Sequence, residues 1–151
     1  MEHMRRHARP NAVRTVHRPL HPRHQLELQV DADPFWMSAL RALTTDVAIR
    51  ADFDLDSVAD LTLAVDEACA MLIDAAQPED TLVCRFAVAA DRITVTVTLP
   101  VGWHDRPGLS TDTFGWRVMV TLVDDVELLD GTGGDATLAI RLAKLRVPAG
   151  G

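Results

Sequence analysis

Alternation of apolar and polar residues is the feature that most restricts the fold of this chain. In residues 25–31, Leu26, Leu28 and Val30 alternate with polar side chains. The same two-residue period recurs in residues 81–88, 92–99 and 136–145. Neighbouring side chains of a strand point to opposite faces, so each segment predicts a strand with one apolar and one polar face. Strands of a doubly wound parallel sheet would instead read as continuous apolar runs, because they are buried on both faces.

Three other segments have the spacing of amphipathic helices. The first follows Asp33-Pro34 and runs to about residue 50, because Asp is a good N-cap and Pro suits the first helical position. Its expected apolar stripe is Trp36, Leu40, Leu43 and Val47. The second helix is capped by Asp54 or Asp56 and buries Val58, Leu61, Val65, Ala68 and Leu72, with Cys69 and Ile73 beside them. The third spans residues 113–124, with Val118, Met119 and Leu122 inward.

Together these elements predict an α/β (α+β) fold, a two-layer sandwich. Its mostly antiparallel mixed sheet is covered on one face by the three helices, because the strands have one polar face each. Short links at residues 89–92 and 130–135 predict two hairpins. The second hairpin joins a strand at residues 126–129 to a strand at residues 136–145. We expect one domain over residues 25–147, a disordered tail over 1–24 and a short C-terminal tail over 148–151.

Charge is unevenly distributed along the chain. Residues 1–24 carry six Arg against one Glu, about +5, and five of the six His, whereas the other 127 residues carry nine basic against twenty-one acidic side chains, about −12. An acidic body repels nucleic acid and attracts basic surfaces. For the tail, a nucleic-acid or metal-binding arm is one interpretation, and a disordered solvated extension is the one we favour.

The hydropathy and cysteine content of the chain also indicate its cellular compartment. No apolar run reaches eighteen residues, which predicts no membrane span, and no apolar segment follows the basic start as in a secretory signal. Cys69 and Cys84 lie in apolar settings, which favours reduced, buried thiols in a cytoplasmic protein.

An acid pair interrupts the second helix. Residues 61–76 read LTLAVDEACAMLIDAA, and Glu67 lies roughly 200° around the helix from the core residue Val65. Met71 is four residues after Glu67 and therefore points the same way. Asp66 and Glu67 are either ordinary surface acids or part of a functional site, and the residue pattern alone leaves both readings open.

The segments LAVDEACAMLI and FGWRVMVTLVDDVEL resemble the GHKL ATPase superfamily, and within it the RsbW/SpoIIAB type of anti-sigma factor serine kinases. The first is similar to the family's N-box helix, and the second to its second glycine box with the following helix and strand. FDLDSVADLTLAVDE and DDVELLDG resemble the actinobacterial, UsfX-like anti-sigma F branch. The resemblance covers about residues 25–145 and implies a GHKL (Bergerat-like) ATPase fold.

The resemblance also implies roles for individual positions. Glu67 matches the general base of active members, which phosphorylate an anti-anti-sigma partner with ATP and Mg²⁺. Met71 stands where the family has the Asn that holds Mg²⁺, and a thioether is a poor ligand for this hard cation. Pro100 stands at the adenine-recognising Asp, while Gly102 and Gly115 remain as reduced forms of the two glycine boxes. We therefore expect no metal ligand at Met71, and weak or no kinase activity.

Three functions follow as hypotheses. The first is an anti-sigma factor that sequesters an alternative (sigma F/B-type) sigma factor, is released by a STAS-type anti-anti-sigma factor and forms a homodimer, as the resemblance implies. It contacts neither nucleic acid nor membrane. The second is an active serine kinase in which Asp66 or Asp74 replaces the missing Asn. The third is a nucleic-acid-binding module that uses the basic tail.

Other candidate sites have simpler readings. DGTGGD at residues 130–135 lacks the Lys of a phosphate-binding P-loop and precedes a strand, which indicates a hairpin turn. His104-Asp105 could form the base half of a catalytic triad, but the sequence has no Ser or Cys in a nucleophile elbow. We therefore interpret the pair as polar loop residues. Trp103 and Trp116 flank the loop, and filling of the core or a pocket is favoured over partner contact for both.

Overall fold

The structure is a computed structural model that describes residues 23–100, 108–131 and 137–148. The elements in chain order are β1 (His24–Asp31), the 3₁₀ turn η3 (Pro34–Trp36), α2 (Met37–Arg50), α3 (Leu55–Asp74), β2 (Thr81–Val88), β3 (Arg92–Pro100), α4 (Phe114–Leu122), β4 (Asp125–Asp130) and β5 (Thr137–Leu145). Nearly all of the predicted N-terminal tail lies outside the described residues. No helix among the described residues is long and apolar enough to cross a membrane.

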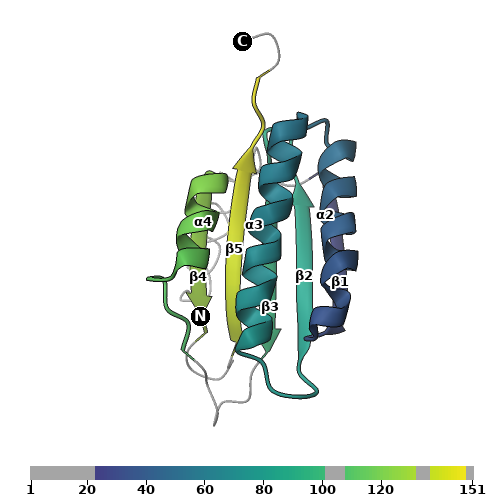
Figure 1. Cartoon of the computed structure of the whole chain (residues 1–151). Helices are drawn as coiled ribbons and strands as arrows, with labels where there is room; N and C mark the ends of the chain where they lie inside the picture. The colour runs from purple at the N-terminus through teal and green to yellow at the C-terminus, as the bar shows by residue number, and fades with distance from the viewer. Residues whose placement is uncertain (1–22, 101–107, 132–136, 149–151) are drawn as a thin grey trace, which may run out of the picture.

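The five strands form one sheet in the order β1-β2-β3-β5-β4. Every pairing is antiparallel, so the sheet is not mixed as the sequence suggested. The three α-helices cover one face of the sheet, with α3 between α2 and α4 (Figure 1). The predicted α+β two-layer sandwich is thereby confirmed, and so are both hairpins.

The core fills the space between α3 and the central strands. In β3 the residues Ile93, Val95, Val97 and Leu99 are fully buried, as the two-residue period predicts. The apolar stripe of α3 faces them and is buried along its length, in a set comprising Val58, Leu61, Ala64, Val65, Ala68, Cys69 and Leu72. Asp54 caps this helix by accepting a hydrogen bond from the Ser57 backbone N–H at 3.2 Å.

Both cysteines are buried and free, as expected. Cys69 comes from α3 and Cys84 from β2. The neighbouring Cys84 side chain and burial raise the pKa of the Cys69 thiol well above its ordinary value, so the thiol stays protonated at neutral pH.

The face of the sheet away from the helices is polar. Arg85 of β2 pairs with Glu27 directly opposite on β1, and Arg141 of β5 pairs with Glu127 opposite on β4. These exposed pairs contribute little to stability individually, but opposite charges in register favour this strand pairing. The predicted solvated face is therefore present.

The stripe predicted for the first helix is partly wrong. Residues 34–36 form a 3₁₀ turn, capped by Asp33 as expected, and α2 begins only at Met37. Because a 3₁₀ turn has three residues per turn, it shifts the phase of the residues before α2. Trp36 therefore stays 37% exposed, with its ring edge-on to Phe35, and the buried positions are Leu40, Thr44 and Ala48. The Thr44 hydroxyl is satisfied because it donates to the Leu40 carbonyl at 2.8 Å.

The two edges of the sheet differ in chemistry. The edge strand β4 has the sequence DVELLD, with acidic side chains at Asp125, Glu127 and Asp130. The edge strand β1 instead carries Leu26, which is 42% exposed although an apolar contact was expected from its alternation. Leu26 lies at the rim of the helix layer, where α2 covers β1 only in part.

Truncating a buried residue of α3 tests this arrangement. We expect Leu72→Ala to lower the free energy of unfolding by about 2–5 kcal/mol, because it removes methyl groups and leaves a cavity between α3 and the sheet. The matched control on the same helix is Leu63→Ala, at a side chain 49% exposed, for which we expect a change of about 0.5 kcal/mol or less. Urea unfolding followed by circular dichroism measures both, and equal effects would contradict the burial of this face.

Candidate functional site

Three residues singled out in the sequence meet where α3 faces α4. A Cβ atom placed on Gly115 would lie 2.5 Å from Glu67 Oε1, 3.6 Å from Glu67 Cδ and 3.8 Å from Met71 Sδ. Glu67 and Met71 are one turn apart on α3 and both are half-buried. The structure thus brings together the predicted general-base position, the predicted metal-ligand position and the glycine of the second box.

Gly115 permits this close approach because it has no side chain. It lies in the first turn of α4, whose N-cap is Thr113; the Thr113 hydroxyl accepts a hydrogen bond from the Trp116 backbone N–H at 3.1 Å. The amino end of a helix carries partial positive charge, so a carboxylate beside it is stabilised. Glu67 makes no hydrogen bond or ion pair with another described residue, and its carboxylate lies against Gly115 in the first turn of α4.

The donors present at this junction do not fit the Mg²⁺ of a bound nucleotide. Mg²⁺ prefers oxygen ligands in octahedral geometry, whereas Met71 offers a soft thioether beside a single carboxylate. Asp66, one of the two proposed substitutes, faces α2 instead, where its Oδ1 lies 2.7 Å from Arg41 Nη1. The other, Asp74, is exposed at the end of α3. Among the described residues, no group of three or more His, Cys, Asp or Glu side chains is arranged to hold a metal ion.

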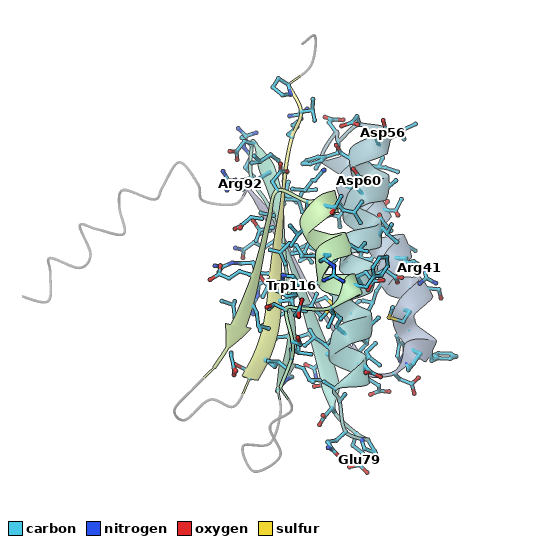
Figure 2. All side chains as sticks on the ribbon, turned by 60° about the vertical axis from the view of Figure 1, so that its left-hand side comes forward. Arg41, Asp56, Asp60, Glu79, Arg92 and Trp116 are labelled. Carbon is cyan, nitrogen blue, oxygen red and sulfur yellow. The ribbon has the colours of Figure 1, made fainter. Side chains whose placement is uncertain are left out.

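The remaining predicted positions are less informative. Pro100 is the last residue of β3, pairs with Thr137 of β5 and is exposed, so it brings no carboxylate to the site. Gly102, Trp103, His104 and Asp105 lie outside the described residues. Trp116 is half-buried and packs against the core, in agreement with the filling role that we favoured (Figure 2).

Sequence reasoning missed a residue that fixes α4 in place. Lys144 of β5 donates to the Leu122 carbonyl at the carboxyl end of α4 at 2.8 Å, and its Nζ lies 3.6 Å from Asp60 Oδ2 of α3. Its side chain is only 14% exposed. The one signal in the sequence is that Lys144 is the only lysine of the chain. A cation at a helix C-terminus is favourable, so Lys144 ties α3, α4 and the sheet together at the end of α4 opposite Gly115.

The helix-covered antiparallel sheet and the facing positions of Glu67 and Gly115 are compatible with an ATPase-type domain. The chain belongs to the histidine kinase-like ATPase family, since the family model described as histidine kinase-like ATPase domain matches residues 30–142. The resemblance inferred from the sequence motifs is thereby confirmed.

Individual relatives agree with this family. The chain is 38% identical over 104 residues to anti-sigma-F factor RsbW of Mycobacterium tuberculosis, which covers 68% of this chain and 60% of that protein. It is 29% identical over 127 residues to serine-protein kinase RsbW of Bacillus subtilis, covering 72% of this chain and 79% of the relative. The chain thus spans about 60% of the length of the mycobacterial relative.

A solved structure shares the fold. The crystal structure of the RsbU and RsbW domains of Rv1364c from Mycobacterium tuberculosis matches with a TM-score of 0.63 and 19% identity, covering 85% of this chain and 34% of that one. At this identity the likeness establishes the fold alone.

Coupling between Gly115 and Glu67 is testable. An alanine in a helix is about 1 kcal/mol more favourable than a glycine, but in the wild type its methyl group would displace the Glu67 carboxylate. We therefore expect Gly115→Ala to leave the free energy of unfolding unchanged or lowered in the wild type. In a Glu67→Ala background the same change should raise it by about 0.5–1 kcal/mol. Urea unfolding of the four proteins gives the coupling energy.

The control for this cycle is Gly108, around which a Cβ atom would meet nothing within 4 Å. Gly108→Ala should have the same effect whether residue 67 is Glu or Ala. A coupling energy of zero between residues 115 and 67 would show that the contact is not formed in solution.

Proposed function

We propose that this protein is an anti-sigma factor that holds an alternative sigma factor until an anti-anti-sigma partner of STAS type displaces it. The name of the mycobacterial relative supports this function, and membership of the histidine kinase-like ATPase family is compatible with it. The function places the protein in the cytoplasm, and the free thiols of Cys69 and Cys84 are in keeping with that compartment.

The junction of Glu67, Met71 and Gly115 is the observation that favours sigma-factor binding over serine-kinase activity. Phosphoryl transfer depends on a metal that neutralises and positions the phosphates. Here the ligand position holds a thioether, and the glycine turn that would approach a phosphate lies against the Glu67 carboxylate.

Charge supports a basic partner. Residues 25–151 carry an excess of acidic side chains of about −12, from nine basic and twenty-one acidic residues. Complementary potentials speed the encounter with a positively charged protein and suppress wrong partners. The same excess opposes direct binding of this body to DNA or RNA.

Co-purification tests the holding role directly. The full chain, tagged and produced beside candidate sigma factors of the sigma F/B type, should retain one of them at physiological salt, and an anti-anti-sigma protein should release it. Under the holding function Glu67 has no catalytic role. The Glu67→Ala variant should therefore retain the same sigma factor as the wild type, to within about twofold in the amount bound. Failure to retain any sigma factor would contradict the proposal.

The alternative of an active kinase is tested by nucleotide binding. Since a ligand that binds the native state must raise its stability, we expect Mg-ATP at about 1 mM to change the melting temperature by less than about 1 °C. Incubation with labelled ATP should leave an anti-anti-sigma partner unlabelled. Labelling that Glu67→Ala abolishes would establish the kinase instead.

We further propose that the protein is a homodimer assembled at the β1 edge. A groove of about 460 Å³ runs between α2 and this edge, with an apolar lining formed by Leu26, Leu43, Val47, Ala51, Phe86 and Val88. Among the described residues no strand pairs with the outer edge of β1, so its backbone groups can pair with a second chain.

A charged substitution tests this assembly. Leu26→Lys places a cation on the exposed edge strand, and we expect it to weaken dimerisation by at least about tenfold, because charged edge residues oppose strand pairing. Val120→Lys, at an exposed position of α4, is the control and should leave the assembly unchanged. Sedimentation velocity over a dilution series distinguishes them, and an unaltered dimer in Leu26→Lys would place the interface elsewhere.

A further inference from the structure

A second groove, of about 800 Å³, lies at one end of the molecule and is used by neither proposal above. It is formed where the connection between α2 and α3 meets the β2–β3 turn and the segment after β5. Its lining consists of Ile49, Asp52, Phe53, Asp54, Ala90, Asp91, Arg146, Val147 and Pro148. We call it the end groove. The side chains of Ile49 and Val147 are 53% and 61% exposed, so its walls offer apolar surface to an occupant.

The rim of the end groove is negatively charged. Asp52, Asp54 and Asp91 outnumber the one cation among the lining residues, Arg146, whose Nη2 lies 4.0 Å from Asp52 Oδ2. Arg92, next to the lining, pairs with Asp91 at 3.2 Å, so Asp54 and Asp52 supply most of the negative charge. The hydrogen bond from Ser57 lowers the pKa of Asp54, and Arg92 lowers the pKa of Asp91, so both carboxylates remain ionised at neutral pH. Asp56 adds negative charge at the same end of the molecule, where Figure 2 labels it on α3; Asp60, labelled beside it, is paired with Lys144.

The chain enters the described part beside this groove. The Arg23 backbone N–H donates to the Val88 carbonyl at 2.6 Å, and Val88 directly precedes the β2–β3 turn whose Ala90 and Asp91 line the groove. Residues 1–22 therefore join the body next to the groove. An extended residue spans about 3.3–3.6 Å, so a few residues are enough to reach it.

Residues 1–22 also have the complementary chemistry. They carry five Arg against one Glu, a charge of about +4, together with Val13, Val16 and Leu20. Arginine forms bidentate contacts with carboxylates, and its stem covers apolar surface. The end groove and this basic segment belong to one chain, so their encounter is intramolecular. The effective concentration of the segment at the groove is therefore in the millimolar range, about 1 mM or more.

We propose that residues 1–22 dock in the end groove, with their arginines against Asp52, Asp54 and Asp91 and their apolar side chains against Ile49 and Val147. The docked segment blocks the access of other cations to this end of the body, so a basic partner must displace it. This regulatory consequence rests on the proposed anti-sigma function, whereas the docking itself does not.

Limited trypsin digestion of the full chain tests the docking without any partner. Trypsin cleaves after arginine unless proline follows, so Arg5, Arg6 and Arg14 are the cleavable positions within residues 1–22, and a docked arginine is protected. The test variant combines Asp52→Asn, Asp54→Asn and Asp91→Asn. Asn tolerates the left-handed backbone of residue 52, whose φ is 63°, and it caps a helix as well as Asp does at residue 54. A matched control variant, Asp74→Asn with Asp112→Asn and Asp125→Asn, makes the same charge change at exposed positions elsewhere.

At about 20 mM NaCl we expect cleavage within residues 1–22 to be about fivefold slower in the wild type and the control variant than in the groove variant, the scale of a few exposed ion pairs. At about 500 mM NaCl the three rates should converge, because salt screens these pairs. Mass spectrometry identifies the cleaved bonds, and circular dichroism verifies that each variant is folded.

Three results would overturn the proposal. Equal rates for the wild type and the groove variant at low salt would show that the groove does not protect the segment. Rates in the control variant that rise as much as in the groove variant would assign the effect to overall charge. Protection that disappears on dilution would show that the segment enters the groove of a neighbouring molecule instead.

Discussion

The burial of one side of α3 against the sheet is the interaction on which the rest of the structure depends. Leu61, Val65, Ala68 and Leu72 lose nearly all their exposure against β3 and β5. Each large side chain buried in this way contributes about 1.5–3 kcal/mol. The buried stripe fixes the rotation of α3 about its axis, and therefore also the direction of the side chains outside the stripe. Glu67 and Met71 are thereby held toward α4. A surface acid thereby becomes part of a defined junction.

The junction is held from its other end by Lys144. This residue reaches from the sheet to the last carbonyl of α4 and to Asp60 of α3. Three elements that are far apart in the sequence therefore share one cation. The position of Gly115 against Glu67 follows from two restraints, the N-cap of α4 at Thr113 and the anchor at its carboxyl end.

The repeating patterns made the layers of the fold predictable, whereas single contacts between distant elements were not. The two-residue period in β2, β3 and β5 identified the buried faces, and the cap at Asp54 located the start of α3. The misplacement of Trp36 arose because a 3₁₀ turn and an α-helix share the same start signal. The approach of Gly115 to Glu67 spans 48 positions, and no local pattern reports such a distance. Family resemblance put both residues in one site, but the geometry of their contact required coordinates.

The unequal edges of the sheet have a consequence for assembly. A second copy that paired along β4 in antiparallel fashion would bring the acidic side chains of two DVELLD segments close together, and like charges opposite each other are unfavourable. Strand addition is thus disfavoured at the β4 edge, whereas among the described residues the β1 edge is open to it. A molecule with a single receptive edge stops growing after one addition. In the dimer proposed above, the acidic side chains of β4 therefore oppose further strand addition and growth into fibrils.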